Sequence, residues 1–160
     1  MLAPIPSAIA MATLTTTFAS AEKWGFESAT VGNKAFYAAF QIDESGDFVL
    51  SVECYEGSPP VITVATPFLW DQTASYAPDV PATFVIDGAE ISDVLFYFDF
   101  SLDGEDLVAF PDGQEAAFRG LIEAFGSARD TIALSYFDKS ASFSADGATE
   151  ALFTLLDGCI

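Results

Sequence analysis

The feature that most constrains the fold is an alternating stretch, residues 47–55, which contains one of only two cysteines in the chain. Its apolar residues share one parity: Phe48, Leu50, Val52 and Cys54. A period of two predicts a half-buried β-strand with Cys54 on its inward face. The second cysteine, Cys159, follows an apolar helical segment. We therefore predict a disulfide that ties the last helix to this strand.

A Cys54–Cys159 bond closes a loop of about a hundred residues, which the chain-entropy model values at about 4–5 kcal/mol. Two such cysteines are typical of an oxidising compartment, and two buried free thiols are the alternative. A metal site is less favoured, because the sequence has no histidine and no C-x-x-C motif. We expect no bound metal and no cofactor.

The first residues of the sequence have the character of an export signal. Residues 1–21 carry no charged side chain, contain the apolar run 8–14 and end in Ala-Ser-Ala before Glu22. Ala19 and Ala21 fit a signal-peptidase site, although no Lys or Arg precedes the run. A membrane anchor is the alternative, but the run is shorter than the ~20 residues that a span needs. We expect a signal peptide at 1–21, a single domain at 22–160, and a periplasmic or secreted protein without membrane contact after cleavage.

The charge of the chain limits its partners. Only 5 Lys and Arg stand against 24 Asp and Glu, which gives a formal net charge of -19. A phosphate backbone would repel such a surface, so nucleic acid is excluded as a partner. Solubility in salt, cations or a basic protein partner remain as explanations of the acidity.

Hydrophobic periodicity predicts an α+β fold, as an antiparallel β-sheet or sandwich of about seven or eight strands with two helices, the last tied to the sheet by the disulfide. Three consecutive antiparallel strands are expected at 34–42, 47–55 and 61–65. Further strands are expected at 83–86, 91–100, 107–110, 131–137 and 142–144. The helices are expected at 112–126 and 148–156, with Asp112 as a cap of the first and Gly158 as the stop of the second.

The segment between Pro67 and Pro81 has no clear period and is rich in rings. A long irregular connection of this kind is either a lid packed on the core or a contact surface for a partner. Its candidate partner-binding residues are Phe68, Leu69, Trp70 and Tyr76.

Few residues point to a reaction. Without histidine or a G-x-S-x-G motif, nucleophilic catalysis has no candidate residue. Residues 99–104 match the first half of an EF-hand loop, but Phe110 stands where the loop needs its bidentate acid. A hairpin turn at Asp103 and Gly104 is favoured over a calcium site formed by Asp103, Glu105 and Asp106.

Several different short motifs follow one another along the chain: Trp24, Leu50-Ser51-Val52-Glu53-Cys54, Ile86-Asp87-Gly88, the helix around 118–125, Phe143-Ser144-Ala145-Asp146-Gly147 and Leu155-Leu156-Asp157-Gly158-Cys159. In this layout the chain resembles small exported Gram-negative proteins similar to the type VI secretion-associated VasI-type family. The resemblance implies a periplasmic accessory role and the Cys54–Cys159 bridge, and it carries over no catalytic residue.

We therefore expect a non-enzymatic periplasmic accessory or protein-interaction module. An acidic inhibitor of a basic hydrolase such as a lysozyme is one alternative, attracted by electrostatic steering. An exported enzyme that uses carboxylates is the other.

Overall fold

The computed structural model describes residues 23–69, 79–99 and 104–160. These residues form ten strands and two helices, with the strands in two antiparallel sheets, so the predicted α+β class is confirmed. The expected signal peptide at 1–21 lies outside the described residues.

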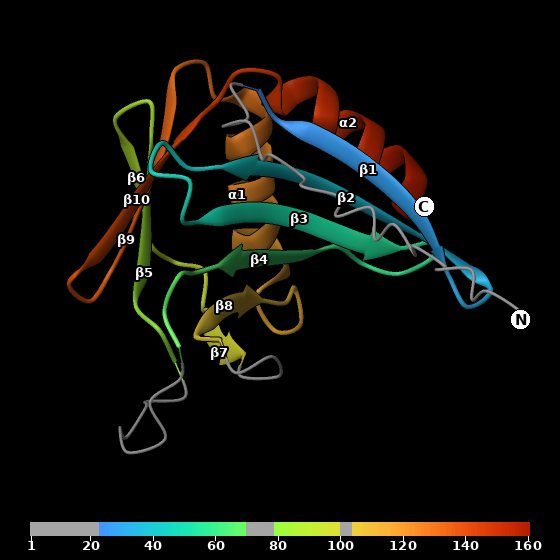
Figure 1. Ribbon diagram of the computed structural model, residues 1–160, viewed down its shortest axis with the longest axis horizontal. Helices are drawn as coiled ribbons and strands as arrows, with labels where there is room; N and C mark the ends of the chain where they lie inside the picture. The colour runs from blue at the N-terminus through green and yellow to red at the C-terminus, as the bar shows by residue number, and fades with distance from the viewer. Residues whose placement is uncertain (1–22, 70–78, 100–103) are drawn as a thin grey trace, which may run out of the picture.

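The larger sheet has six strands in the order β1-β2-β3-β4-β8-β7. Their bounds are β1 (Gly25–Val31), β2 (Lys34–Ile42), β3 (Val49–Tyr55), β4 (Val61–Ala65), β8 (Asp106–Ala109) and β7 (Tyr97–Asp99). The predicted run of three antiparallel strands is confirmed as β2, β3 and β4. The chain leaves this sheet after β4 and returns with β7 and β8 (Figure 1).

The smaller sheet has four strands in the order β10-β9-β5-β6. Their bounds are β10 (Lys139–Ser144), β9 (Thr131–Tyr136), β5 (Ala82–Ile86) and β6 (Ala89–Ile91). The predicted turn at Asp87 and Gly88 joins β5 to β6, and both residues have positive φ, 49° and 89°. Positive φ at two central residues is the geometry that favours Asp-Gly in tight hairpins.

Helix α2 (Ala148–Cys159) packs against β1, β2 and β3 on one face of the larger sheet, which we call its inner face, and helix α1 (Glu115–Ser127) packs against α2. Figure 1 shows α1 behind β2, β3 and β4, with α2 alongside β1. Strand register places a row of buried side chains on the inner face: Ala39, Val52, Ile62 and Ala109. The core therefore lies between this face, the helices and the smaller sheet.

Helix α1 buries the four residues that its spacing predicts: Phe118, Leu121, Ile122 and Phe125. The ring of Phe125 lies 5.1 Å from that of Phe84 on β5, and the ring of Phe96 lies 5.8 Å from Phe84. This aromatic cluster joins the helix to the smaller sheet.

The predicted N-cap of the first helix and the predicted C-terminal stop of the second helix are both wrong. Gly113, at φ 78°, turns the chain after Asp112, so Gln114 becomes the N-cap and no side chain caps the helix. Gly158 lies inside α2 rather than ending it. A Cβ at Gly158 would sit 3.0 Å from the ring of Tyr37, so the helix approaches this β2 side chain closely at the glycine.

The predicted strand at 91–100 is confirmed only in part: residues 97–99 form β7, whereas residues 92–96 connect the two sheets. Ile91 ends β6 in the smaller sheet, whereas Tyr97 begins β7 in the larger one. Between them Val94 and Phe96 are buried while Leu95 is 48% exposed. The alternation of a strand is thus present, but Leu95 bonds through both backbone groups to the Gln114 side chain instead of to a neighbouring strand.

Strand β1 is not predicted from the sequence. It pairs with β2 along its whole length. Its position is fixed by Trp24, which is 6% exposed and donates from Nε1 to the Ser144 carbonyl at 2.9 Å. The Trp24 backbone N–H also donates to the Asp146 carbonyl at 2.8 Å. These bonds join the start of the described chain to the β10–α2 connection.

Candidate functional site

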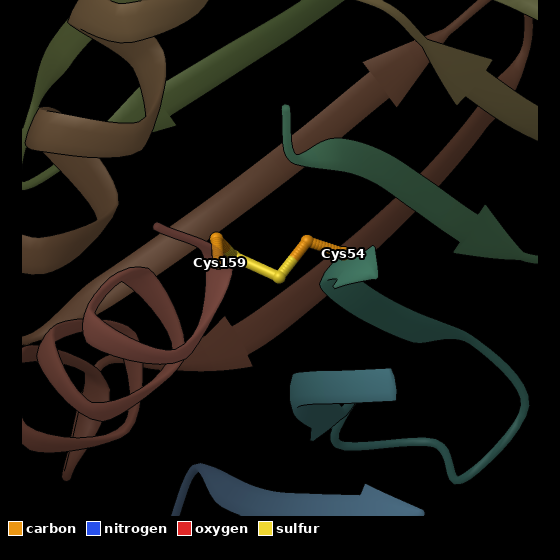
Figure 2. Close-up of a disulfide and its surroundings, with 2 residues drawn as sticks. All are labelled: Cys54 and Cys159. Atoms are coloured by element: carbon orange, nitrogen blue, oxygen red, sulfur yellow. A yellow bond between two sulfur atoms is a disulfide. The ribbon is translucent and has the colours of Figure 1, made fainter. Parts of the chain in front are cut away.

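The two cysteines form the predicted disulfide (Figure 2). Cys54 extends from the inner face of β3 and meets Cys159 at the last turn of α2, with the Cα atoms 5.8 Å apart. The Cys159 carbonyl also accepts a hydrogen bond from Gly57 N–H at 3.1 Å. The free-thiol alternative therefore does not apply, and the bond indicates an oxidising compartment.

The four candidate partner-binding residues have different positions. Phe68 packs against the core, with its ring 5.9 Å from that of Phe48. Leu69 is 79% exposed and forms an isolated bridge with Gly104. Trp70 and Tyr76 lie outside the described residues. Phe68 thus has the position of a lid residue, and Leu69 that of a surface residue.

The described acidic residues of the candidate calcium loop interact with other protein groups. Glu105 is 5% exposed and forms an ion pair with Lys139 at 2.9 Å. Asp106 accepts a hydrogen bond from Thr66 N–H at 3.0 Å, and Asp103 lies outside the described residues. Among residues 23–69, 79–99 and 104–160, no group of three His, Cys, Asp or Glu side chains is placed to hold a metal ion.

Two aromatic rings lie close to the Lys139 ammonium group. Its Nζ lies 4.7 Å from the ring centroid of Phe68 and 5.6 Å from that of Tyr136. Burial raises the pKa of the Tyr136 phenol, and the charge of Glu105 raises it further. Lys139 thus neutralises a buried carboxylate and stabilises the rings by cation–π contact.

The side-chain carboxylate of Asp43 stabilises the β2–β3 turn through several hydrogen bonds. Asp43, which is 4% exposed, accepts hydrogen bonds from Ser45 Oγ and from the backbone N–H groups of Ser45, Asp47 and Phe48. Burial raises the pKa of Asp43, but these hydrogen bonds outweigh burial, so the pKa is lower than usual. The turn is therefore stabilised by the ionised form.

The outer face of the larger sheet is a further functional candidate. Strand register places the following apolar residues on it: Phe36, Phe40, Ile42, Val49, Tyr55, Val61, Val108 and Tyr97. Both described helices lie on the opposite face, so neither covers it (Figure 1). An apolar sheet face that no described helix covers is typical of an interaction surface.

A groove of about 510 Å³ lies on this face and next to the β3–β4 turn. Its lining combines aromatic, aliphatic and acidic residues: Phe36, Glu53, Cys54, Tyr55, Ser58, Pro59, Val61, Thr63, Asp99, Asp106, Val108 and Phe110. Three of these are acids and none is Lys or Arg. We call this set the outer groove; it is apolar in its walls and negative in charge.

Other hollows do not share this combination. One of about 450 Å³ near the start of α2 includes Lys23, and one of about 400 Å³ beside α1 includes Arg119. A third, of about 570 Å³ between β6 and α1, has no aromatic residue in its lining. The outer groove is therefore the candidate site that we develop below.

Sequence reasoning did not identify this groove. It found the parity of β2 and β3, but it had no means of placing β8 beside β4, which brings Asp106 and Val108 next to Thr63. The sequence feature that could have indicated this surface is β2, which has apolar residues at both its odd and its even positions and therefore on both faces of the sheet. A strand that is apolar on both faces has partners on both faces.

No family model, curated protein or solved structure matches the chain. Within the described parts of the chain, no helix is long and apolar enough to cross a membrane.

Proposed function

We propose that this protein is a non-enzymatic accessory or interaction module of the periplasm or the extracellular space, and that it binds a basic protein partner. The resemblance to the VasI-type family adds a secretion-associated role to this proposal. The disulfide supports the compartment, because such bonds persist where thiols are oxidised.

The observation that carries the proposal is the outer groove. It joins apolar walls to three carboxylates, on a face that neither helix covers. A net charge of -19 attracts a basic partner over a distance of about 10 Å at moderate salt. Apolar contact in the groove then supplies affinity that salt does not screen.

Capture from a periplasmic extract tests the proposal. The oxidised protein serves as bait at about 50 mM and about 500 mM salt, which span strong and weak screening. We expect a basic protein that is enriched at low salt and reduced at high salt. Capture of no protein, or of acidic proteins only, would contradict the proposal.

Inhibition of a basic hydrolase is the special case that a lysozyme assay tests. The assay measures lysozyme activity with increasing amounts of the protein at the same two salt concentrations. Inhibition that weakens with salt would identify the partner class as basic hydrolases. Unchanged activity would remove lysozyme as the partner and leave the wider proposal to the capture experiment.

A further inference from the structure

We infer that the outer groove binds an extended segment of the partner in which Lys or Arg side chains flank apolar ones. This inference rests on the proposed function and adds to it the binding surface and the chemistry of the bound segment.

One end of the outer groove is aromatic. Phe36 on β2 and Tyr55 on β3 are directly paired across the two strands, and their ring centroids lie 5.2 Å apart. Tyr55 is 41% exposed, and Phe110, which follows β8, is 47% exposed. Rings that keep this much exposed area offer flat apolar contact to a partner side chain, and they also attract cations.

The carboxylates of the groove are held in place by the sheet. Ser51 Oγ donates to Glu53 Oε1 at 2.5 Å, and Thr66 N–H donates to Asp106 Oδ1. Asp106 on β8 is directly paired with Asp99 on β7, so both side chains lie on the same face. Like charges placed directly opposite each other cost stability, and a bound cation offsets that cost.

The spacing of these acids sets the length of the segment. Glu53 pairs with Val61, and the register of β4 with β8 places Val61 beside Phe110, four residues beyond Asp106. Two strand spacings and four residue rises separate Glu53 from Asp106 by about 17 Å. An extended chain covers that distance with about five residues. The geometry thus fits a short segment with a cationic side chain at each end and apolar side chains between them.

Charge excludes a second copy of this chain as the favoured occupant. Two molecules of net charge -19 repel each other, and their outer grooves would bring acids against acids. A partner segment with Lys or Arg has the opposite sign and is complementary to the groove.

A five-residue peptide, Lys-Thr-Phe-Thr-Lys with blocked ends, is the probe for the experiment, because an extended chain places its Lys and Phe side chains on the same face. Binding to the oxidised protein is measured by NMR shifts and by calorimetry. Two peptides serve as controls: Glu replaces Lys in the first, and Ser replaces Phe in the second. We expect the probe to shift the outer-groove residues and to bind about tenfold more tightly than either control peptide.

Two matched pairs of variants locate the site. The change Glu53→Gln with Asp99→Asn should weaken probe binding about tenfold, whereas Glu123→Gln with Asp157→Asn on the helices alters the net charge equally and should weaken it less than about twofold. Phe110→Ser should weaken binding similarly, while Phe153→Ser, at an α2 residue that is 75% exposed, should leave it unchanged. A thermal melt of each variant confirms that it is folded.

Several results would overturn the inference. They are absence of probe binding, equal weakening by both members of a pair, a native dimer that Phe110→Ser dissociates, and probe binding only after residues 1–22 are removed. The last two would show a second copy or the leading segment in the groove. If the capture experiment still finds a basic partner that binds the groove variants normally, the proposed function survives and this binding surface does not.

Discussion

Cys54 on β3 and Cys159 on α2 are covalently joined across a sequence separation of 105 residues. The bond encloses every element from β4 to α2, and it leaves β1, β2 and most of β3 outside the loop. Strands β1 and β2 are paired with each other and with β3, and the Trp24 backbone and indole add hydrogen bonds from the start of β1 to the end of β10 and the β10–α2 connection. The C-terminal helix is therefore attached to the larger sheet by the disulfide to β3 and by packing on β1, β2 and β3.

Removal of the disulfide should destabilise the protein strongly. The double change Cys54→Ala and Cys159→Ala is expected to lower the free energy of unfolding by about 4 kcal/mol, because the unfolded chain regains the entropy that the loop restricts. Denaturant unfolding measures the loss. Mass analysis after alkylation in denaturant, without reductant, should find neither sulfur labelled. Two alkylated sulfurs would contradict both the bond and the compartment inferred from it.

Loss of the Lys139 charge should be far more costly than loss of Lys23. Lys139→Met leaves Glu105 charged and buried, and we expect a loss of about 3 kcal/mol in unfolding free energy. Lys23→Met removes an exposed ion pair with Asp146 and should change stability by less than about 0.5 kcal/mol. Addition of Glu105→Gln to Lys139→Met should recover part of the loss. Similar effects of the two lysine changes would show that the Lys139 pair is solvated.

The Asp43 turn should make stability depend on acid pH. Its pKa is lowered below the ordinary 3.8, so the ionised carboxylate stabilises the fold above that value and the contribution is lost as the pH falls through the folded pKa. Asp43→Asn should cost about 2 kcal/mol at pH 7, and the difference from the parent should shrink below pH 3.8. Asp47→Asn, an exposed change in the same turn, is the control. A difference that stays constant down to pH 2 would argue against the role of ionised Asp43.

Two helical glycines should respond to alanine with opposite signs. A Cβ at Gly120 in α1 meets no atom within 4 Å, so Gly120→Ala should stabilise the protein by about 0.5–1 kcal/mol through helix propensity. A Cβ at Gly158 in α2 would lie 3.0 Å from the Tyr37 ring, and Gly158→Ala should cost about 1 kcal/mol or more. Melting temperatures of both variants test the contrast. A stabilising Gly158→Ala would mean that the ring of Tyr37 moves aside easily.

The sequence correctly predicts the helices and strands that depend on residues close together in the chain. The strand with Cys54, its hairpin with β2 and the core face of α1 follow from local periodicity, and the structure confirms each of them. The helix ends were wrong because Gly113 and Gly158 act through backbone turning and close approach, which periodicity does not report. The strand predicted at 91–100 includes the connection at 92–96 because apolar residues alternate along it, although the backbone there leaves one sheet for the other.

The candidate site depends on pairings that are distant in sequence. Glu53 and Asp106 reach the same groove only because β8 returns to β4. Periodicity predicts which face of a strand is apolar, but it does not predict which strands are neighbours. The short motifs that resemble the VasI-type family lie mainly in fold-determining positions such as Trp24, the β3 strand and the Asp87 turn. They therefore describe the scaffold more than the groove.

The strand order of the larger sheet also bears on the sequence of folding events. Strands β1 to β4 form a meander from contiguous chain, whereas the β4–β8 pairing and the docking of α2 join segments that are far apart in the sequence. Local contacts form faster than those that close long loops, so the meander is expected to nucleate first. Pulse-labelling hydrogen exchange would then protect amides of β2 and β3 before those of β8. In such a pathway the acidic groove is among the last surfaces to acquire its shape, and a partner meets it only on a molecule whose folding is complete.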